Sequence, residues 1–222
     1  MSNEKKLYTR EGNYIYFGSY PQGENGEIEP IKWRILSEEN GEALLLSEYI
    51  LDAHRFDKKS NNYKDSEIRK WLNNEFYNKA FNENEKQIIL TTEVDNSERS
   101  TNPNRNANEF NKGKNKHACE NTQDKVFLLS MQEATNPKYG FDESDNSHKS
   151  REKKPTAYAI KQGAWYDDEE GCETYGNGYW WLRSPLYCLI NSAWIVDYVG
   201  GVDYSGVDYT DYGVAGALKI KL

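Results

Sequence analysis

Aspartate and tyrosine side chains crowd the last third of this chain, where they could serve a metal ion, a catalytic pair or a binding partner. They recur side by side, at Asp197-Tyr198, Asp203-Tyr204, Asp208-Tyr209 and Asp211-Tyr212. Tyrosine offers a large, rigid contact area with a polar tip at low entropic cost, and small polar side chains add adaptable hydrogen bonds. The composition of this segment therefore favours a binding surface.

The same aspartates raise the question of calcium. Ca²⁺ takes six to eight oxygen ligands, and an EF-hand supplies them from alternating acidic positions closed by a glycine. That spacing is absent, as are the Glu-Pro-Asn, Gln-Pro-Asp and Trp-Asn-Asp signatures of calcium-dependent lectins, and the run 167–170 is typical of a solvated acidic turn. We predict no metal site and no cofactor, while a site assembled from distant aspartates stays open.

Catalytic motifs are equally scarce. Glycosidases use paired carboxylates, but no pair is singled out here by its spacing. A Ser-His-Asp signature, a glycine-rich phosphate loop and H-E-x-x-H are all absent. No C-x-x-C spacing occurs, so the cysteines are expected to be isolated thiols, and the histidines lie in polar stretches where solvent exposure is expected. The cysteines are Cys119, Cys172 and Cys188, and the histidines are His54, His117 and His148. We predict a protein that is not an enzyme.

Composition excludes further classes of function. The chain has 222 residues, of which 36% are hydrophobic and 14% aromatic, and its mean hydropathy is −0.98. Such low hydropathy would favour disorder if aromatics were scarce, so bulky aromatic side chains are expected to form the core. The net charge of −8 makes binding to a nucleic-acid backbone unfavourable.

No segment is long and apolar enough to insert in a membrane, so no membrane insertion is expected. The N-terminus runs into a strand-like stretch without the apolar region of a signal peptide. A cytoplasmic location, or a phage- or surface-associated one reached by another route, is therefore expected.

Hydrophobic patterning predicts an α+β fold in which strands lie at both ends and helices in the middle. Alternation and turn residues predict strands over 13–21, 31–36 and 43–47, with a tight Asn40-Gly41 turn. Apolar residues at helical spacing predict a helix from Asp65, capped by Asp65 or Ser66, and a second helix over 83–90. Both are expected to be packing helices.

The second half continues this pattern. Residues 95–122 lack periodicity and read as a long polar loop or insertion. A buried strand is predicted over 125–129, followed by a short helix that a capping box opens at Ser130 and Glu133. Further strands are predicted over 180–183, 193–198, 202–204, 207–209 and 218–220. With no linker between two independent patterns, residues 1–222 are expected to form one domain.

Five stretches of the chain form a known pattern: Tyr16-Phe17-Gly18-Ser19-Tyr20-Pro21, Ile31-Lys32-Trp33-Arg34-Ile35-Leu36, Ser66-Glu67-Ile68-Arg69-Lys70-Trp71-Leu72-Asn73, Val126-Phe127-Leu128-Leu129-Ser130 and Trp180-Trp181-Leu182-Arg183-Ser184-Pro185. Through these stretches the chain resembles the bacterial and phage-associated DUF6273 family. The family's closing motif usually reads Gly-Val-Arg-Pro-Ala-Leu, whereas this chain has Gly213-Val214-Ala215-Gly216-Ala217-Leu218. Any salt bridge by which that arginine fixes the last strand is therefore missing here.

The resemblance implies a C-type-lectin-like fold of the formylglycine-generating-enzyme type, with short twisted antiparallel sheets and two to three packing helices. That fold also carries the variable proteins of diversity-generating retroelements, whose mutable Asn codons yield residues such as Tyr, Asp, Ser and Cys. Residues 187–192 and the Asp-Tyr pairs fit this set, whereas Trp194 does not. Duplication of a Val-Asp-Tyr hairpin unit is an equal alternative. Formylglycine-generating enzymes use a cysteine pair, and Cys172 and Cys188 lack that motif's context.

Residues 180–222 are thus expected to combine a scaffold with a variable binding surface. We expect Val196, Val202, Val207 and Val214 to face the core, and the polar and aromatic residues between them to face a protein or cell-surface glycan. The alternatives are that several tyrosines bury their rings, that the same face serves a carbohydrate-active or protein-modifying enzyme, or that the domain is a structural appendage. The predicted ligand-binding residues are Tyr187, Asn191, Ser192, Trp194, Asp197, Tyr198, Asp203, Tyr204, Ser205, Asp208, Tyr209, Asp211 and Tyr212.

Overall fold

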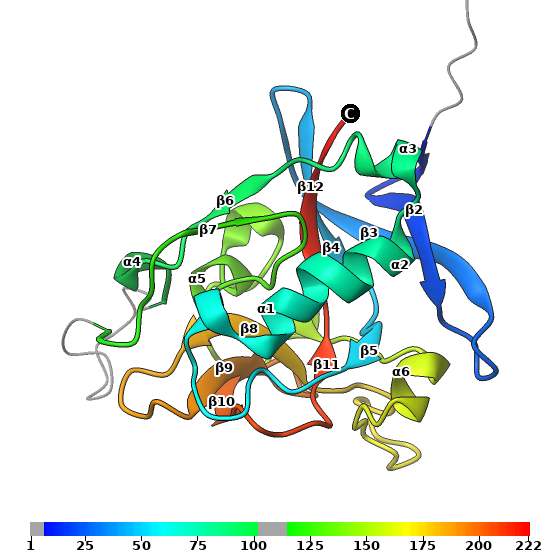
Figure 1. Cartoon of the computed structure of the whole chain (residues 1–222). Coiled ribbons are helices and arrows are strands. Elements are labelled where there is room, and N and C mark those ends of the chain that lie inside the picture. The colour runs from blue at the N-terminus through cyan, green and yellow to red at the C-terminus, as the bar shows by residue number, and fades with distance from the viewer. Residues whose placement is uncertain (1–6, 102–114) are drawn as a thin grey trace, which may run out of the picture.

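A computed structural model describes residues 7–101 and 115–222 of the chain. Two five-stranded sheets and a two-stranded sheet form the framework, and short helices lie between and around them (Figure 1). The architecture is mixed α+β, which confirms the class predicted from the pattern of elements.

The first sheet is built from the N-terminal meander and the last strand of the chain. Its order is β1-β2-β3-β4-β12, and every pair is antiparallel. Asn40 and Gly41 both have positive φ, 54° and 78°, as the predicted tight turn between β3 and β4 requires. The strands are β1 Thr9–Glu11, β2 Tyr14–Pro21, β3 Ile28–Glu39, β4 Glu42–Ser47 and β12 Ala217–Lys221.

The second sheet is the C-terminal one, in the order β10-β9-β8-β11-β5. Its pairs are antiparallel except β11 with β8, which run parallel where Gly213 pairs with Trp180. The strands are β5 Asp52–Ala53, β8 Trp180–Pro185, β9 Ser192–Val196, β10 Val202–Gly206 and β11 Gly213–Val214. A separate two-stranded sheet pairs β6 Thr92–Val94 with β7 Thr122–Asp124.

The helix predicted to start near residue 65 from the spacing of apolar residues is present. Ser66 accepts a hydrogen bond from the Arg69 N–H, and the helix continues from α1 through a π-helical turn into α2. Figure 1 shows this segment crossing in front of β12. The helices are η1 Tyr63–Asp65, α1 Glu67–Trp71, η2 Leu72–Phe76, α2 Tyr77–Ala80, α3 Glu83–Lys86, α4 Glu98–Thr101, α5 Met131–Ala134, η4 Pro137–Tyr139, η5 Lys149–Arg151 and α6 Ala157–Lys161.

Three local predictions need correction. The helix predicted over 83–90 ends at Lys86, because Ile89 leaves it to bridge Ile220 of β12. The segment 125–129 is buried as expected but makes only one bridge, from Phe127 to Ala217, so it is not a strand. Residues 95–122 include α4 and reach into β7; residues 102–114 of that loop lie outside the described part of the chain.

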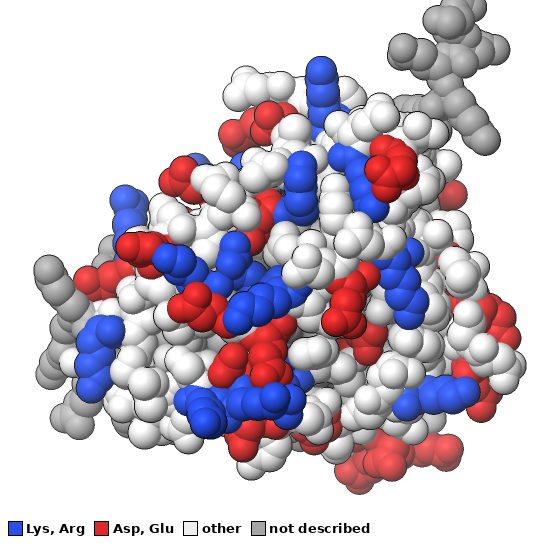
Figure 2. All heavy atoms as spheres, in the orientation of Figure 1, with Lys and Arg blue, Asp and Glu red and all other residues white. Residues whose placement is uncertain are grey.

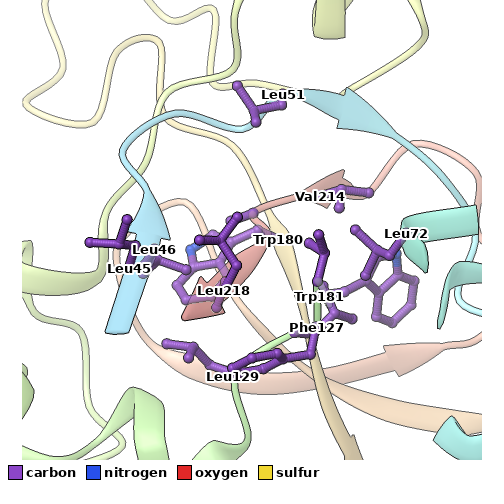
Figure 3. Packing of buried hydrophobic residues seen from close by; sticks show 14 of the residues in the cluster. Leu45, Leu46, Leu51, Leu72, Phe127, Leu129, Trp180, Trp181, Val214 and Leu218 are labelled. Carbon is purple, nitrogen blue, oxygen red and sulfur yellow. The ribbon is translucent and has the colours of Figure 1, made fainter. Parts of the chain in front are cut away.

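One hydrophobic cluster joins the two sheets. Trp180 and Trp181 are both fully buried, and Figure 3 places Trp180 on the side of Leu218 and Trp181 on the side of Leu72. Each indole N–H is satisfied, from Trp180 to the Arg151 carbonyl and from Trp181 to the His54 carbonyl. The Trp-Trp dipeptide therefore anchors the C-terminal sheet to both sides of the core.

The last strand is held without the arginine of the family motif. Ala215 is fully buried, and the Ser47 N–H donates to the Gly216 carbonyl just before β12 begins. From there β12 pairs with β4 over its whole length. Main-chain pairing and burial thus fix the C-terminal strand.

Candidate functional site

The predicted binding region is built on the β8-β9-β10 part of the C-terminal sheet. Cross-strand partners share a face of a sheet, so the register sorts its side chains. Trp180, Val196 and Val202 lie opposite one another and are buried on one face. On the other face, Trp181, Ile195 and Asp203 lie opposite one another, and Asp203 at the edge strand is exposed.

The four valines predicted to face the core do so. Val196, Val202, Val207 and Val214 are all buried. Residues 207–209 do not form the strand predicted for them. They form a turn that other loops hold, since the Val207 N–H donates to the Asn191 carbonyl and the Val207 carbonyl accepts from the Asp57 N–H.

Asp197 has a structural part in the hairpin between β9 and β10. Its carboxylate accepts hydrogen bonds from the N–H groups of Val199, at 3.0 Å, and Gly201, at 2.6 Å. Burial raises the pKa of this carboxyl, against the lowering effect of the two N–H donors. Gly200 completes the turn with a φ of 76°, a conformation that a side chain rarely adopts.

Four aromatic rings gather beside this hairpin and form what we call the aromatic array, Trp165, Tyr179, Tyr198 and Tyr212. Ring centroids lie 4.8 Å apart for Trp165 and Tyr179, 5.5 Å for Trp165 and Tyr198, and 5.1 Å for Tyr179 and Tyr212. Trp165 is 39% exposed and the three tyrosines are half-buried. The array is therefore a packed group of rings that are partly exposed to solvent.

The array is fixed to the sheet by its inner members. Tyr212 packs edge-on against the buried Trp181, with centroids 5.0 Å apart, and its hydroxyl accepts a hydrogen bond from Ser205 at 2.9 Å. The main-chain N–H of Trp165 donates to the main-chain carbonyl of Asp211. Tyr209, 54% exposed, packs on Tyr212 at 5.7 Å and extends the array into solvent.

The predicted surface does not form a single face. Trp194 and Tyr204 lie opposite each other in the β9-β10 ladder, one residue out of step with Ile195 and Asp203. Successive side chains of a strand point to opposite sides, so this pair lies on the other side of the sheet from Asp203 and Ser205. The two rings contact each other edge-on at 6.1 Å. The predicted residues of the β9-β10 ladder thus divide into two groups.

A third group lies on the loop between β8 and β9. The buried Asn61 side chain donates to the carbonyls of Leu186 and Leu189 in this loop and of Ser192 at the start of β9, and it thereby fixes the loop to the strand. Asn191 is exposed and Tyr187 half-buried. Ser192 is only 6% exposed, so its side chain does not belong to an exposed surface, contrary to the prediction.

Negative charge is concentrated in the same region. Residues 165–212 contain nine Asp and Glu and a single Arg, a net charge of −8, whereas the rest of the chain has 27 acidic and 27 basic residues. That arginine, Arg183, is buried and bonds to Glu133. In Figure 2 red side chains gather at the lower edge of the molecule, near the loop that follows α6.

The nearby negative charge affects the pKa values of the tyrosines in the array. Burial, together with Tyr212, Tyr198, Asp197 and Asp203, raises the pKa of Tyr179 to about 12. Burial also raises the pKa of Tyr212, with Asp211 and Asp203 adding to the effect of burial. Among the described residues, no salt bridge involves Asp197, Asp203, Asp208 or Asp211. The phenols therefore stay neutral beside carboxylates that have no ion-pair partner.

Sequence reasoning missed Trp165 and Tyr179 as members of this group. Both lie outside the Asp-Tyr repeats and reach the site only through folding, although Trp165 directly precedes the acidic run 167–170. Of the histidines, only His148 is exposed. His54 is half-buried beside Trp71 and His117 is also half-buried, so the exposure predicted for these two was wrong.

Three properties of the described residues bear on the class of site. In residues 7–101 and 115–222 no group of three or more His, Cys, Asp or Glu side chains is placed to hold a metal ion. The three cysteines are free thiols, with Cys172 and Cys188 exposed and Cys119 half-buried. No helix within the described ranges is long and apolar enough to cross a membrane.

Fold and site together define an α+β protein whose C-terminal sheet carries an aromatic, acidic surface. Residues 40–222 match the family described as "Domain of unknown function (DUF6273)", and the chain belongs to that family. The motifs at 66–73, 126–130 and 180–185 lie inside the match, while those at 16–21 and 31–36 precede it. No curated protein and no solved structure matches the chain.

Proposed function

We propose that this is a non-enzymatic ligand-binding protein that recognises a protein or a cell-surface glycan through the aromatic, acidic surface of its C-terminal sheet. The scaffold we propose is the C-type-lectin-like one. Its C-terminal positions vary among close relatives, as in proteins diversified by retroelements. The proposal rests mainly on one observation, the separation of buried valines from exposed Tyr and Asp within the same short segment.

This separation suits recognition because the hydrogen bonds that shape the segment leave the exposed side chains free. The turn is made by Asp197 and Gly200, and the loop before β9 is held by Asn61. Tyr204 and Tyr209, 46% and 54% exposed, can change identity without breaking these contacts. Rigid aromatic side chains on such a frame are typical of antibody-like paratopes.

A catalytic use of the same face has less support. Of the aspartates that raise the pKa of Tyr179, Asp197 and Asp203, the first is engaged by two N–H groups of its own turn. A nucleophile or a general acid needs a carboxylate free to reach the substrate. We therefore propose binding and not hydrolysis.

The test is a paired screen of the purified protein on a glycan array and on a display library of random 12-residue peptides. Replacing Tyr198, Tyr204 and Tyr209 together by Ala should remove at least nine-tenths of the binding found for the wild type. The melting temperature should change little, because two of the three rings are largely exposed. Tyr49→Ala, which removes a ring 38% exposed outside the C-terminal sheet, is the matched control.

Two outcomes would contradict the proposal. One is that neither screen yields a ligand whose binding is weakened by the triple substitution. The other is collapse of the fold in the triple variant, which would show that these rings are part of the core.

A further inference from the structure

The aromatic array faces carboxylates that have no cationic partner, and this combination defines the chemistry of the group it can hold. Asp203 lies on the same face of the sheet as Trp181, against which Tyr212 of the array packs. One oxygen of Asp203 accepts the N–H of Tyr204, and the carboxylate forms no salt bridge within the described residues. Asp203 is exposed, so it can meet a partner.

The rings themselves add to the attraction for a cation. A Lys or Arg group over the face of Trp or Tyr gains about 0.5–1 kcal/mol at an exposed site and about 2 kcal/mol when it is desolvated. Trp165, 39% exposed, and the half-buried Tyr198 pack against each other in the array, with centroids 5.5 Å apart. Asp197 and Asp203 both contribute to the raised pKa of Tyr179, which is consistent with their place beside the array.

The distribution of charge also favours a basic partner, over a longer range than direct contact. The whole net charge of −8 arises from residues 165–212, where the one basic residue, Arg183, is buried. All other charged residues of that segment are acidic, and one of them, Glu173, pairs with Lys149 of η5. Charge complementarity steers association and excludes acidic partners.

We propose that the aromatic array and Asp203 bind an arginine or lysine side chain on an exposed segment of a partner protein. The inference rests on the proposed function and narrows it to one class of partner. A guanidinium fits best, because its planar group can stack on a ring and donate two hydrogen bonds to one carboxylate. A glycan partner is the alternative outcome, since stacked rings and an aspartate can also contact a sugar.

The experiment uses the full chain and peptides selected on it from a library of random 12-residue sequences. The selected peptides should be enriched in Arg and Lys relative to the unselected library. The tightest binder is then synthesised with each Arg replaced by citrulline, its neutral isostere, and each Lys by Gln. We expect the affinity to fall at least tenfold in the neutral peptide.

Variants of the protein test whether Asp203 and Trp165 contact the basic side chain of the peptide. Asp203→Asn and Trp165→Ala should each weaken the basic peptide at least fivefold, and Asp203→Asn should hardly affect the citrulline peptide. Glu29→Gln, an exposed acidic residue of β3, is the control and should leave affinity unchanged. Melting temperatures verify that each variant is folded.

The outcomes separate this inference from the function on which it rests. Peptides without enrichment in basic residues, equal binding of the citrulline peptide, or full affinity in Asp203→Asn would each overturn the inference. Binding confined to the glycan array would overturn it and leave the recognition function standing. No ligand from either screen would overturn both.

Discussion

Lys153 is a buried lysine, and its titration should therefore affect the stability of the protein. It lies between η5 and α6, is 3% exposed, and its ammonium donates to the carbonyls of Ser47 and Glu48. Burial and the nearby Arg34 lower its pKa to about 7, while Glu48 acts in the opposite direction. Nearby, the indole ring of Trp180 faces the ammonium at 5.6 Å.

The sign of the pH dependence follows from this lowered pKa. Between about pH 7 and pH 10.5, the unfolded state holds a proton on Lys153 that the folded state has released, so raising the pH favours folding. The slope approaches about 1.4 kcal/mol per pH unit in this window. We expect the free energy of unfolding, measured with urea at pH 7 and 9.5, to rise more in the wild type than in Lys153→Met. Parallel pH profiles would contradict this assignment.

At the scale of secondary-structure elements, the turn between β9 and β10 positions the site. A Cβ on Gly200 would lie 2.1 Å from the His148 carbonyl oxygen, and its φ of 76° is already unfavourable for a side chain. The Gly200 carbonyl also accepts a hydrogen bond from Arg151 at 2.7 Å. The hairpin is thereby fixed to the segment that precedes α6.

Replacing Gly200 by Ala should therefore destabilise the protein by about 2–4 kcal/mol, from backbone strain and steric overlap together. Gly26→Ala is the matched control, since Gly26 has a similar φ of 83° but nothing within 4 Å of its Cβ position. It should cost only about 1 kcal/mol, which is the strain alone. Chemical denaturation of both variants checks the difference, and equal losses would show that the contact with His148 is not formed.

At the scale of the whole molecule, the C-terminal tail couples the two large sheets. β11 belongs to the second sheet, and β12, two residues later, belongs to the first. Leu218 of β12 is fully buried in the one hydrophobic cluster that contains residues of both sheets. The two sheets should therefore unfold together.

Leu218→Ala should cost about 2–5 kcal/mol through lost burial and the cavity left behind. Tryptophan fluorescence and far-ultraviolet circular dichroism should report one coincident transition in both wild type and variant. Leu222→Ala, which truncates a side chain 41% exposed, should change the free energy of unfolding by less than about 0.5 kcal/mol. Separated transitions would mean that residues 1–222 comprise more than one cooperative unit.

The sequence by itself determined those features that depend on neighbouring residues. Alternation predicted the N-terminal strands, Asn40-Gly41 their turn, and Ser66 and Ser130 the starts of two helices, because a few local contacts fix these choices. It also predicted which valines of the C-terminal segment are buried, since a periodic apolar residue must find the core.

The tertiary structure alone decided how the site is assembled. Pairing in the β9-β10 ladder sent Trp194 and Tyr204 to the side of the sheet opposite Asp203, although the Asp-Tyr repeats looked alike in sequence. Trp165 and Tyr179 joined the aromatic array from outside the repeats. Register and packing between distant segments set these positions, and both depend on contacts that no local pattern encodes.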